Sequence, residues 1–263
     1  MAFLSGHFMS QSLARTVPFQ AVIPTKTFQD IVNPGSKSYA DSKPFRTLYL
    51  LHGIGGSDID WLTGTRVGLD AENYGIAIIM PAGENGFYTD NTATNRYGEF
   101  VGQELVEATR AMFNLSHKKE DTAIGGLSMG GYGALRNGLK YADTFGSIMA
   151  LSSALILEDI GKPGSVSFPP FNTEEYNRKV FGDVTKIAGS DLDVKALADK
   201  RAKDVDIYMA CGTEDFLLPK NHDLRDYLQG IDANLTYTEG PGGHDWNFWD
   251  SYIEKAIKWF CEK

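Results

Sequence analysis

Short apolar segments alternate along the chain with longer segments in which apolar residues recur at helical spacing. The apolar segments that favour β-strands are residues 18–25, 45–53, 74–83, 122–128, 146–153, 205–212 and 234–240. Helical spacing is clearest in residues 98–114, and helices are also predicted for residues 60–73, 221–231 and 249–263. This alternation predicts an α/β fold, with a mostly parallel central sheet and helices on both faces.

Two regions depart from this alternation. No helix separates the first strands, near residues 8–23, so we expect them to pair as an antiparallel edge of the sheet. In residues 159–203, prolines, glycines and scattered aromatic residues replace the regular pattern. This segment lies between the sixth and seventh predicted strands and is more typical of a lid than of a separate domain. The sequence therefore predicts one α/β domain over residues 1–263, with a lid-like insertion at 159–203.

One serine stands among four glycines in GGLSMGG, residues 125–131. The apolar run before it predicts a buried strand, and the small residues after it recur at helical spacing. A sharp strand-to-helix turn would bring together the residues two before and two after the serine, and Gly126 and Gly130 have no Cβ to collide there. This is the G-x-S-x-G pattern of a nucleophile elbow, with Ser128 at its tip. A glycine-rich turn with a solvated serine is the alternative, so the assignment depends on finding a base, an acid and an oxyanion site.

A serine hydroxyl is a poor nucleophile until a base, usually histidine, accepts its proton. His244 lies between the last predicted strand and the C-terminal helix, where chain order in this fold places the base for Ser128. His222 belongs to the start of a predicted helix and reads as a surface residue. His7 and His117 precede strands, at the wrong edge of the sheet.

The acid that orients the histidine is expected in the turn after residues 205–212, which offers two neighbouring carboxylates, Glu214 and Asp215. We prefer Asp215, and Glu214 stays open as the alternative because both lie in the same turn.

The oxyanion of the reaction needs two backbone N–H groups aimed at one point. Met129, the residue after the nucleophile, supplies one, and Ile54 in the HGIGG loop after the third strand supplies the other. We expect His52 to be structural and to fix this loop through a hydrogen bond. The alternative is that HGIGG is only a flexible turn. A phosphate-binding loop fits less well, because no lysine follows at the required spacing.

Composition narrows the range of partners. The chain has 263 residues, a net charge of −9 and a pI of about 5.1, without a basic stripe, so we expect no nucleic-acid partner. No apolar stretch is long enough to cross a membrane, and the first residues lack the features of a signal peptide. Cys211 and Cys261 read as thiols in a reducing compartment, which favours a cytoplasmic location. We expect no metal site and no cofactor, and the sequence leaves a homo-oligomer open.

The four motifs LYLLHGIGG, GLSMGGYGA, CGTEDFL and GGHDWNFW, in this order, resemble the esterase D-like branch of the α/β-hydrolases. The likeness extends from about residue 8 to residue 260 and is greatest to small bacterial tributyrin and acetyl esterases. Feruloyl esterases, S-formylglutathione hydrolases and mycolyltransferases share the branch. The resemblance implies Ser128 as nucleophile, Asp215 as acid, His244 as base, and Ile54 and Met129 as oxyanion donors.

The expected activity is that of a serine carboxylesterase that hydrolyses short acyl esters (acetyl, butyryl) or hydroxycinnamoyl (feruloyl) esters through an acyl-enzyme on Ser128. The alternatives are a thioesterase of the S-formylglutathione hydrolase type, an acyltransferase, and a binding module without catalysis. The motifs do not decide the acyl length or the alcohol of the ester.

Aromatic residues in the loops and in the insertion are candidates to contact the substrate, although each could instead belong to the core. They are Trp61, Phe87, Tyr88, Phe168, Phe171, Tyr176 and Phe181.

Overall fold

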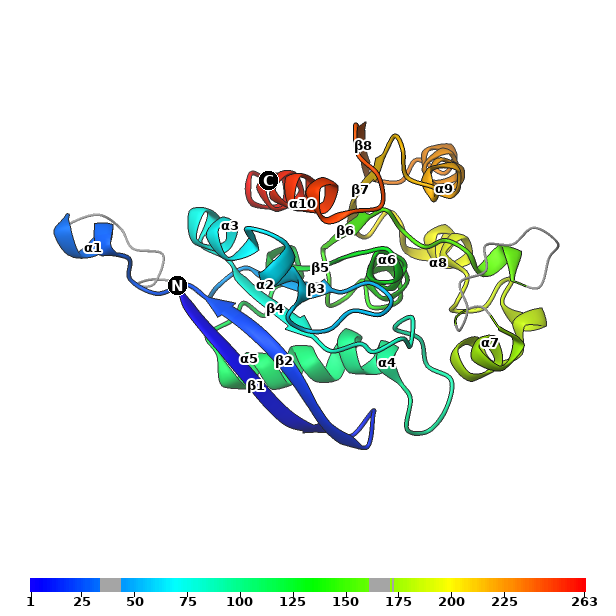
Figure 1. Ribbon diagram of the computed structural model, residues 1–263, viewed down its shortest axis with the longest axis horizontal. Helices are drawn as coiled ribbons and strands as arrows, with labels where there is room; N and C mark the ends of the chain where they lie inside the picture. Colours follow the sequence, from blue (N-terminus) through cyan, green and yellow to red (C-terminus); the bar gives the residue numbers. More distant parts are fainter. Residues whose placement is uncertain (34–43, 161–170, 172) are drawn as a thin grey trace.

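A computed structural model describes residues 1–33, 44–160, 171 and 173–263 of the chain. Within these residues, eight strands form one sheet in the order β1-β2-β4-β3-β5-β6-β7-β8 (Figure 1). The strands are β1 (Ala2–Ser10), β2 (Arg15–Ile23), β3 (Thr47–Leu51), β4 (Ala77–Pro81), β5 (Thr122–Leu127), β6 (Ser147–Leu151), β7 (Asp206–Gly212) and β8 (Leu235–Gly240). Every pair from β4 through β8 is parallel, while β1 and β2 join as an antiparallel edge.

This sheet confirms the predicted fold class. Each of the seven predicted apolar segments overlaps a strand, and the antiparallel edge lies where no helix separates the first strands. The first strand begins earlier than expected, at Ala2, so His7 lies within β1 rather than before it.

Helices cover both faces of the sheet because successive strand residues point to opposite sides. In β3, Leu48 and Leu50 pack with α2 (Asp60–Gly64), α3 (Val67–Tyr74) and α10 (Trp246–Cys261). Tyr49 and Leu51 face the other core, together with the remaining large helices (Figure 1). These are α5 (Leu105–Met112), α6 (Met129–Lys140), α7 (Glu174–Phe181), α8 (Val194–Arg201) and α9 (Leu218–Gly230).

Smaller helices complete the chain. They are α1 (Phe28–Val32), α4 (Tyr97–Glu99), a π-helix (Phe100–Glu104), and 3₁₀ turns at Lys119–Asp121, Leu157–Asp159 and Val184–Lys186. The single helix predicted for residues 98–114 is therefore α4, a π-turn and α5 in succession. The helix predicted for residues 60–73 is divided into α2 and α3.

The described part of the insertion packs onto the sheet domain. Helix α8 lies against α6 and α9, and its Leu197 and Ala198 are buried in the same core as residues of β5 and β6. Phe168, one of the predicted substrate contacts, lies outside the described residues.

Candidate active site

The nucleophile elbow forms where the sequence predicts it. Strand β5 ends at Leu127, helix α6 begins at Met129, and Ser128 between them has φ 55° and ψ −117°. A non-glycine residue held at positive φ costs about 1–3 kcal/mol, which the surrounding structure must offset. A Cβ on Gly126 would lie 2.5 Å from the carbonyl group of Gly130, and a Cβ on Gly130 would collide with the Leu51 carbonyl oxygen. Only glycine therefore fits on either side of the serine.

Three predicted side chains meet at the carboxyl ends of the parallel strands. The Nε2 atom of His244 lies 3.0 Å from the Ser128 hydroxyl oxygen, and its Nδ1 atom lies 2.9 Å from Oδ2 of Asp215. Because a carboxylate can only accept, Nδ1–H donates to Asp215 and leaves Nε2 free to accept the serine proton. Ser128, although only 7 % exposed, thus has a base within hydrogen-bonding distance.

The Asp215 carboxylate is held in its ionised form. Burial of the side chain would raise its pKa, but the hydrogen bonds from His244 and from the Leu217 backbone N–H, the latter 2.8 Å long, keep the pKa below its usual value. Asp215 therefore stays negatively charged at neutral pH and can stabilise a protonated His244.

The alternative acid, Glu214, has a different set of contacts. Its Oε2 atom accepts a hydrogen bond of 2.6 Å from the Gly242 backbone N–H, and its Oε1 atom accepts one from the Thr213 hydroxyl. The Gly242 N–H lowers the pKa of Glu214. Glu214 therefore ties the turn after β7 to the loop that carries His244, while Asp215 is the carboxylate that contacts the imidazole.

The HGIGG loop runs directly beside the nucleophile. A Cβ on Gly53 would lie 2.7 Å from the Leu127 side chain and 3.5 Å from Cβ of Ser128. Met129 is the first residue of α6, so its N–H has no partner within the helix. Among the described residues, neither the Ile54 N–H nor the Met129 N–H donates a hydrogen bond. Both predicted oxyanion donors are thus close to Ser128 and unengaged in this part of the chain.

His52 fixes this loop, as predicted. Its Nδ1–H donates to the Gly53 carbonyl oxygen (2.7 Å), and its Nε2 accepts from the Gly83 N–H (2.8 Å). Burial lowers the pKa of His52, consistent with a neutral imidazole in one tautomer. The Tyr88 hydroxyl adds a third tie by donating to the His52 carbonyl oxygen (3.1 Å).

Four of the predicted substrate contacts belong to the core instead. Trp61 is fully buried against Trp246, and its Nε1–H donates to the Leu51 carbonyl oxygen. Tyr88 is also fully buried, and the rings of Phe87 and Phe181, 2 % and 5 % exposed, pack edge to face with centroids 5.1 Å apart. These side chains have almost no surface left for a ligand, so the prediction that they bind substrate is wrong.

Phe171 has a different environment from these four residues. It is partly exposed and packs edge to face on Tyr176, with ring centroids 5.5 Å apart. Phe171 therefore remains a candidate contact.

Phe216 is a feature of the site that the sequence did not indicate. The residue follows Asp215, its side chain is 51 % exposed, and its ring centroid lies 4.9 Å from that of His244. The Trp249 ring packs edge to face with the same imidazole, with ring centroids 5.0 Å apart. The His244 imidazole thus contacts two aromatic rings, and the Phe216 ring is half exposed to solvent.

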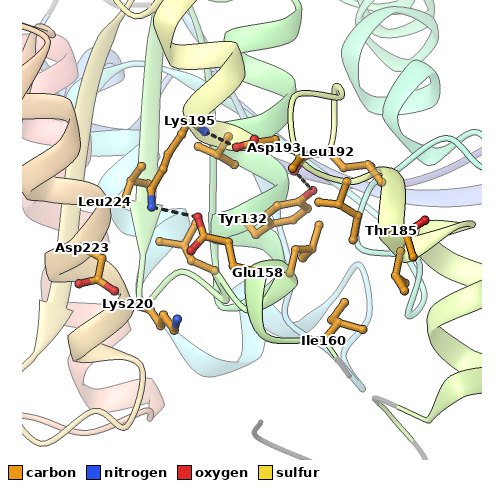
Figure 2. Close-up of a pocket in the computed structure, with 16 residues that line it drawn as sticks. Tyr132, Glu158, Ile160, Thr185, Leu192, Asp193, Lys195, Lys220, Asp223 and Leu224 are labelled. Carbon is orange, nitrogen blue, oxygen red and sulfur yellow. Dashed lines mark hydrogen bonds and ion pairs between the residues drawn. The ribbon is translucent and has the colours of Figure 1, made fainter. Parts of the chain in front are cut away.

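A cavity of about 520 Å³ lies beside Tyr132 in the first turn of α6 (Figure 2). Its walls come from α6, from the loop after β6, from residues 184–195 of the insertion and from α9. Among the lining residues are Tyr132, Leu155, Glu158, Leu192, Lys195 and Leu224.

The described residues were searched for metal-binding clusters and for membrane-spanning helices. No group of three or more His, Cys, Asp or Glu side chains in this part of the chain is arranged to hold a metal ion. No helix among these residues is both long and apolar enough to span a membrane.

The whole chain is similar to known esterases. Residues 30–260 match the Esterase family. The chain is 43% identical to the acetyl esterase of Caldicellulosiruptor saccharolyticus over 271 aligned residues, which cover 100% of this chain and 99% of that protein.

Two solved structures from Staphylococcus aureus are similar over 99% of this chain and 98% of theirs. The fluorophosphonate-binding serine hydrolase FphF has a TM-score of 0.84 and 26% identity, and the S-formylglutathione hydrolase FrmB has a TM-score of 0.82 and 26% identity. The chain therefore belongs to the Esterase family and is a serine esterase.

Proposed function

We propose that this esterase hydrolyses short-chain acyl esters, with acetyl and butyryl esters first and hydroxycinnamoyl esters as the further class, through an acyl-enzyme on Ser128. The observation that carries the proposal is the continuous chain of hydrogen bonds from Ser128 through His244 to Asp215, at 3.0 and 2.9 Å. The acetyl esterase that is 43% identical over the full chain supports acetyl esters.

In the first half of the reaction, the Ser128 oxygen attacks the ester carbonyl carbon while His244 Nε2 takes the hydroxyl proton. The carbonyl oxygen becomes an oxyanion, which the Ile54 and Met129 N–H groups stabilise. Asp215 stabilises the positive charge on His244. The tetrahedral intermediate then collapses, the bond to the alcohol oxygen breaks, and His244 returns the proton to the leaving alkoxide.

In the second half, water attacks the acyl-enzyme. His244 accepts a proton from the water, a second oxyanion forms at the same two N–H groups, and collapse returns the proton to Ser128 Oγ. The products are the free alcohol and the carboxylic acid. The ester and one water molecule balance the two halves of the reaction, and Ser128 and His244 return to their starting protonation states.

The second candidate is hydrolysis of thioesters, because the S-formylglutathione hydrolase of Staphylococcus aureus shares the fold at 26% identity. The chemistry at Ser128 would be the same, and the leaving group would be a thiolate rather than an alkoxide. Comparison of kcat/KM for matched acetyl oxyesters and acetyl thioesters distinguishes the two.

The test of the proposal is a panel of acetyl, butyryl and feruloyl esters with the wild-type protein and Ser128→Ala. We expect turnover of at least the acetyl and butyryl esters, and a loss of about 10⁴-fold or more in Ser128→Ala because the variant has no nucleophile. Ser128→Ala with near-normal turnover would contradict the assignment.

The proposal also covers the role of the insertion, the location of the protein and its oligomeric state. The first point is that the insertion at residues 159–203, of which 161–170 and 172 lie outside the described residues, is lid-like, belongs to a single domain and sets selectivity; the contribution of residues 184–195 to the cavity wall supports this. A cytoplasmic location is supported by the two cysteines, Cys211 and Cys261, which form no disulfide. The sequence leaves a homo-oligomer open, and light scattering after size-exclusion chromatography would determine whether one forms.

A further inference from the structure

We propose that Tyr88 and His52 are positioning residues for the oxyanion donor Ile54. Each of the two side chains holds one of the two successive peptide planes that lead to the Ile54 N–H group, and the buried Arg136 anchors Tyr88 in its place. This inference rests on the proposed function, because it concerns how one of the two oxyanion N–H groups is aimed.

The loop that carries Ile54 has little conformational preference of its own. Residues 52–56 belong to no helix or strand, and residues 53, 55 and 56 are glycines, which adopt a wide range of backbone angles. Gly53 also leaves room for the Leu127 side chain, which would lie 2.7 Å from a Cβ at this position. The direction of the Ile54 N–H therefore depends on the groups that hold the peptide planes of the loop.

The peptide plane between Gly53 and Ile54 contains the donor itself. Because a peptide bond is planar and trans, the Gly53 carbonyl oxygen and the Ile54 N–H point in opposite directions within one plane. The Gly53 carbonyl oxygen accepts hydrogen bonds from His52 Nδ1–H (2.7 Å) and from the Gly56 N–H (3.2 Å). His52 Nε2 accepts from the Gly83 N–H (2.8 Å), which fixes the ring and its tautomer. Holding the carbonyl group in this way fixes the direction of the Ile54 N–H.

The preceding peptide plane, between His52 and Gly53, is held by Tyr88. The Tyr88 hydroxyl donates to the His52 carbonyl oxygen (3.1 Å), and the two rings pack edge to face with centroids 6.0 Å apart. Within the described part of the chain, this hydroxyl is the one donor to the His52 carbonyl oxygen. Burial raises the pKa of Tyr88 well above its usual value, so the hydroxyl keeps the proton that it donates.

Helix α6 holds Tyr88 in an unusual backbone conformation. Phe87 and Tyr88 have φ values of 49° and 54°, and residues strained in this way persist only where their surroundings over-determine them. The Tyr88 carbonyl oxygen accepts hydrogen bonds from Arg136 Nη1 (3.1 Å) and from Asn137 Nδ2 (3.0 Å). The Tyr88 ring lies against Gly133, where a Cβ would come within 2.5 Å of it. These contacts direct the hydroxyl toward the oxyanion loop.

Arg136 is fully buried, and its charge is balanced by two carboxylates. Its Nη2 atom lies 3.1 Å from Asp90 Oδ2 and 2.6 Å from Asp191 Oδ2, and its Nε–H donates to the Asp191 carbonyl oxygen (3.0 Å). Lys140 contacts the same two carboxylates, at 3.0 and 2.7 Å. A buried charge is strongly destabilising unless it is paired in this way. Because Asp191 belongs to the insertion, this cluster connects the insertion through Tyr88 to the oxyanion loop.

The test compares Tyr88→Phe, which removes only the hydroxyl, with Tyr49→Phe as the matched control. Tyr49 is also fully buried, and its hydroxyl is hydrogen-bonded to the Thr109 hydroxyl of α5 (2.8 Å) rather than to the oxyanion loop. For each variant we would measure the melting temperature, kcat and KM with an acetyl ester, and inhibition by a trifluoromethyl ketone. The ketone forms a charged tetrahedral adduct with Ser128, so its affinity reports on the oxyanion site without turnover.

We expect Tyr88→Phe to lower kcat by about 10- to 100-fold, since complete loss of one oxyanion donor costs about 10²- to 10³-fold. The KM should stay within about threefold, and the inhibition constant of the ketone should rise by about the factor by which kcat/KM falls. Tyr49→Phe should change kcat and the inhibition constant by less than about twofold, although its melting temperature also falls. Equal kcat values in the two variants would overturn the positioning role and leave the esterase proposal intact.

Variants of His52 test the other peptide plane, also where Tyr88→Phe does not fold. His52→Asn keeps a side-chain N–H close to the position of Nδ1–H, whereas His52→Leu has no donor for the Gly53 carbonyl oxygen. The kcat of His52→Leu should be about fivefold or more below that of His52→Asn, and equal values would overturn the positioning role. Absence of turnover by the wild-type protein for every ester would instead overturn the proposed function.

Discussion

Two regions of the molecule, the strand-end loops and the insertion, contribute to the site in different ways. The loops after β3, β5, β7 and β8 are short, and backbone hydrogen bonds fix them close to the sheet, so the serine, histidine and carboxylate are held at 3.0 and 2.9 Å. The insertion instead forms a wall of the cavity with residues 184–195 and depends on packing against α6 and α9. In the proposed mechanism, the strand-end loops supply the catalytic side chains, and we propose that the insertion sets the choice of substrate.

The largest expected difference in kcat between two neighbouring residues of the strand-end loops is between Asp215 and Glu214. Asp215→Asn should lower kcat by about 10²- to 10⁴-fold, because the amide cannot stabilise a protonated His244. The matched control, Glu214→Gln, should stay within about threefold, because Glu214 contacts the Gly242 N–H and not the imidazole. Steady-state kinetics with an acetyl ester measure both, and the reverse order of effects would identify Glu214 as the acid.

The effect of Asp215→Asn on the free energy of unfolding should depend on pH. Because hydrogen bonds hold the pKa of Asp215 below its usual value, its stabilising contribution to the folded state is present at neutral pH and is lost as pH falls through that lowered pKa. In Asp215→Asn this contribution is absent, so the difference in unfolding free energy between wild type and variant should shrink as the pH is lowered below about 4. Urea unfolding at several pH values measures it, and a difference that grows in acid would contradict the ionised assignment.

The oxyanion site should show a somewhat smaller effect. Ile54→Pro removes one backbone N–H and should cost about 10²- to 10³-fold in kcat, the usual loss for one oxyanion donor. Ile54→Ala keeps the N–H and is the control, with an expected loss below about fivefold. If both variants lose activity to the same extent, the Ile54 side chain rather than its N–H matters.

The aromatic core of the insertion should affect stability rather than selectivity. Phe181→Ala removes a buried ring that packs on Phe87 and should lower the free energy of unfolding by about 3–5 kcal/mol. The ratio of kcat/KM for acetyl, butyryl and feruloyl esters should remain as in the wild type at a temperature where the variant is folded. A changed ratio would show that Phe181 contacts substrate after all.

The smallest expected effect is at Phe216, which belongs to the strand-end loops and lies beside His244. Phe216→Ala should change the preference among leaving alcohols, aryl against alkyl, by up to about tenfold, because its exposed ring packs on the imidazole that protonates the alcohol. The preference among acyl groups with one fixed alcohol should not change. A shift in acyl preference would show that Phe216 contacts the acyl group instead.

Chain order and strand ends were enough to predict the fold and to bring Ser128, His244 and Asp215 to one edge of the sheet. They were not enough to separate Asp215 from Glu214, because the two are adjacent and differ only in which part of the histidine loop they reach. Which carboxylate reaches His244 depends on how the backbone at Gly212, after β7, packs against Gly242 in the histidine loop. The sequence around either glycine does not reveal this contact.

The pocket-lining aromatic residues were predicted poorly for a related reason. Whether an aromatic side chain in a loop is buried depends on distant partners, and Trp61 is covered by Trp246 from the other end of the chain. The position of Phe216 could not be predicted from hydrophobic periodicity, because it is a single apolar residue in a turn. The division of residues 98–114 by a π-turn is also absent from the apolar spacing, which continues through it.

The most direct test of the central claim is to label the protein with a fluorophosphonate probe and to locate the adduct by peptide mass spectrometry. An activated serine attacks the phosphorus atom, so we expect one adduct per chain, on Ser128, with labelling strongly slowed in Asp215→Asn and near normal in Glu214→Gln. An adduct on another residue, or ester turnover by a protein that the probe does not modify, would contradict this expectation.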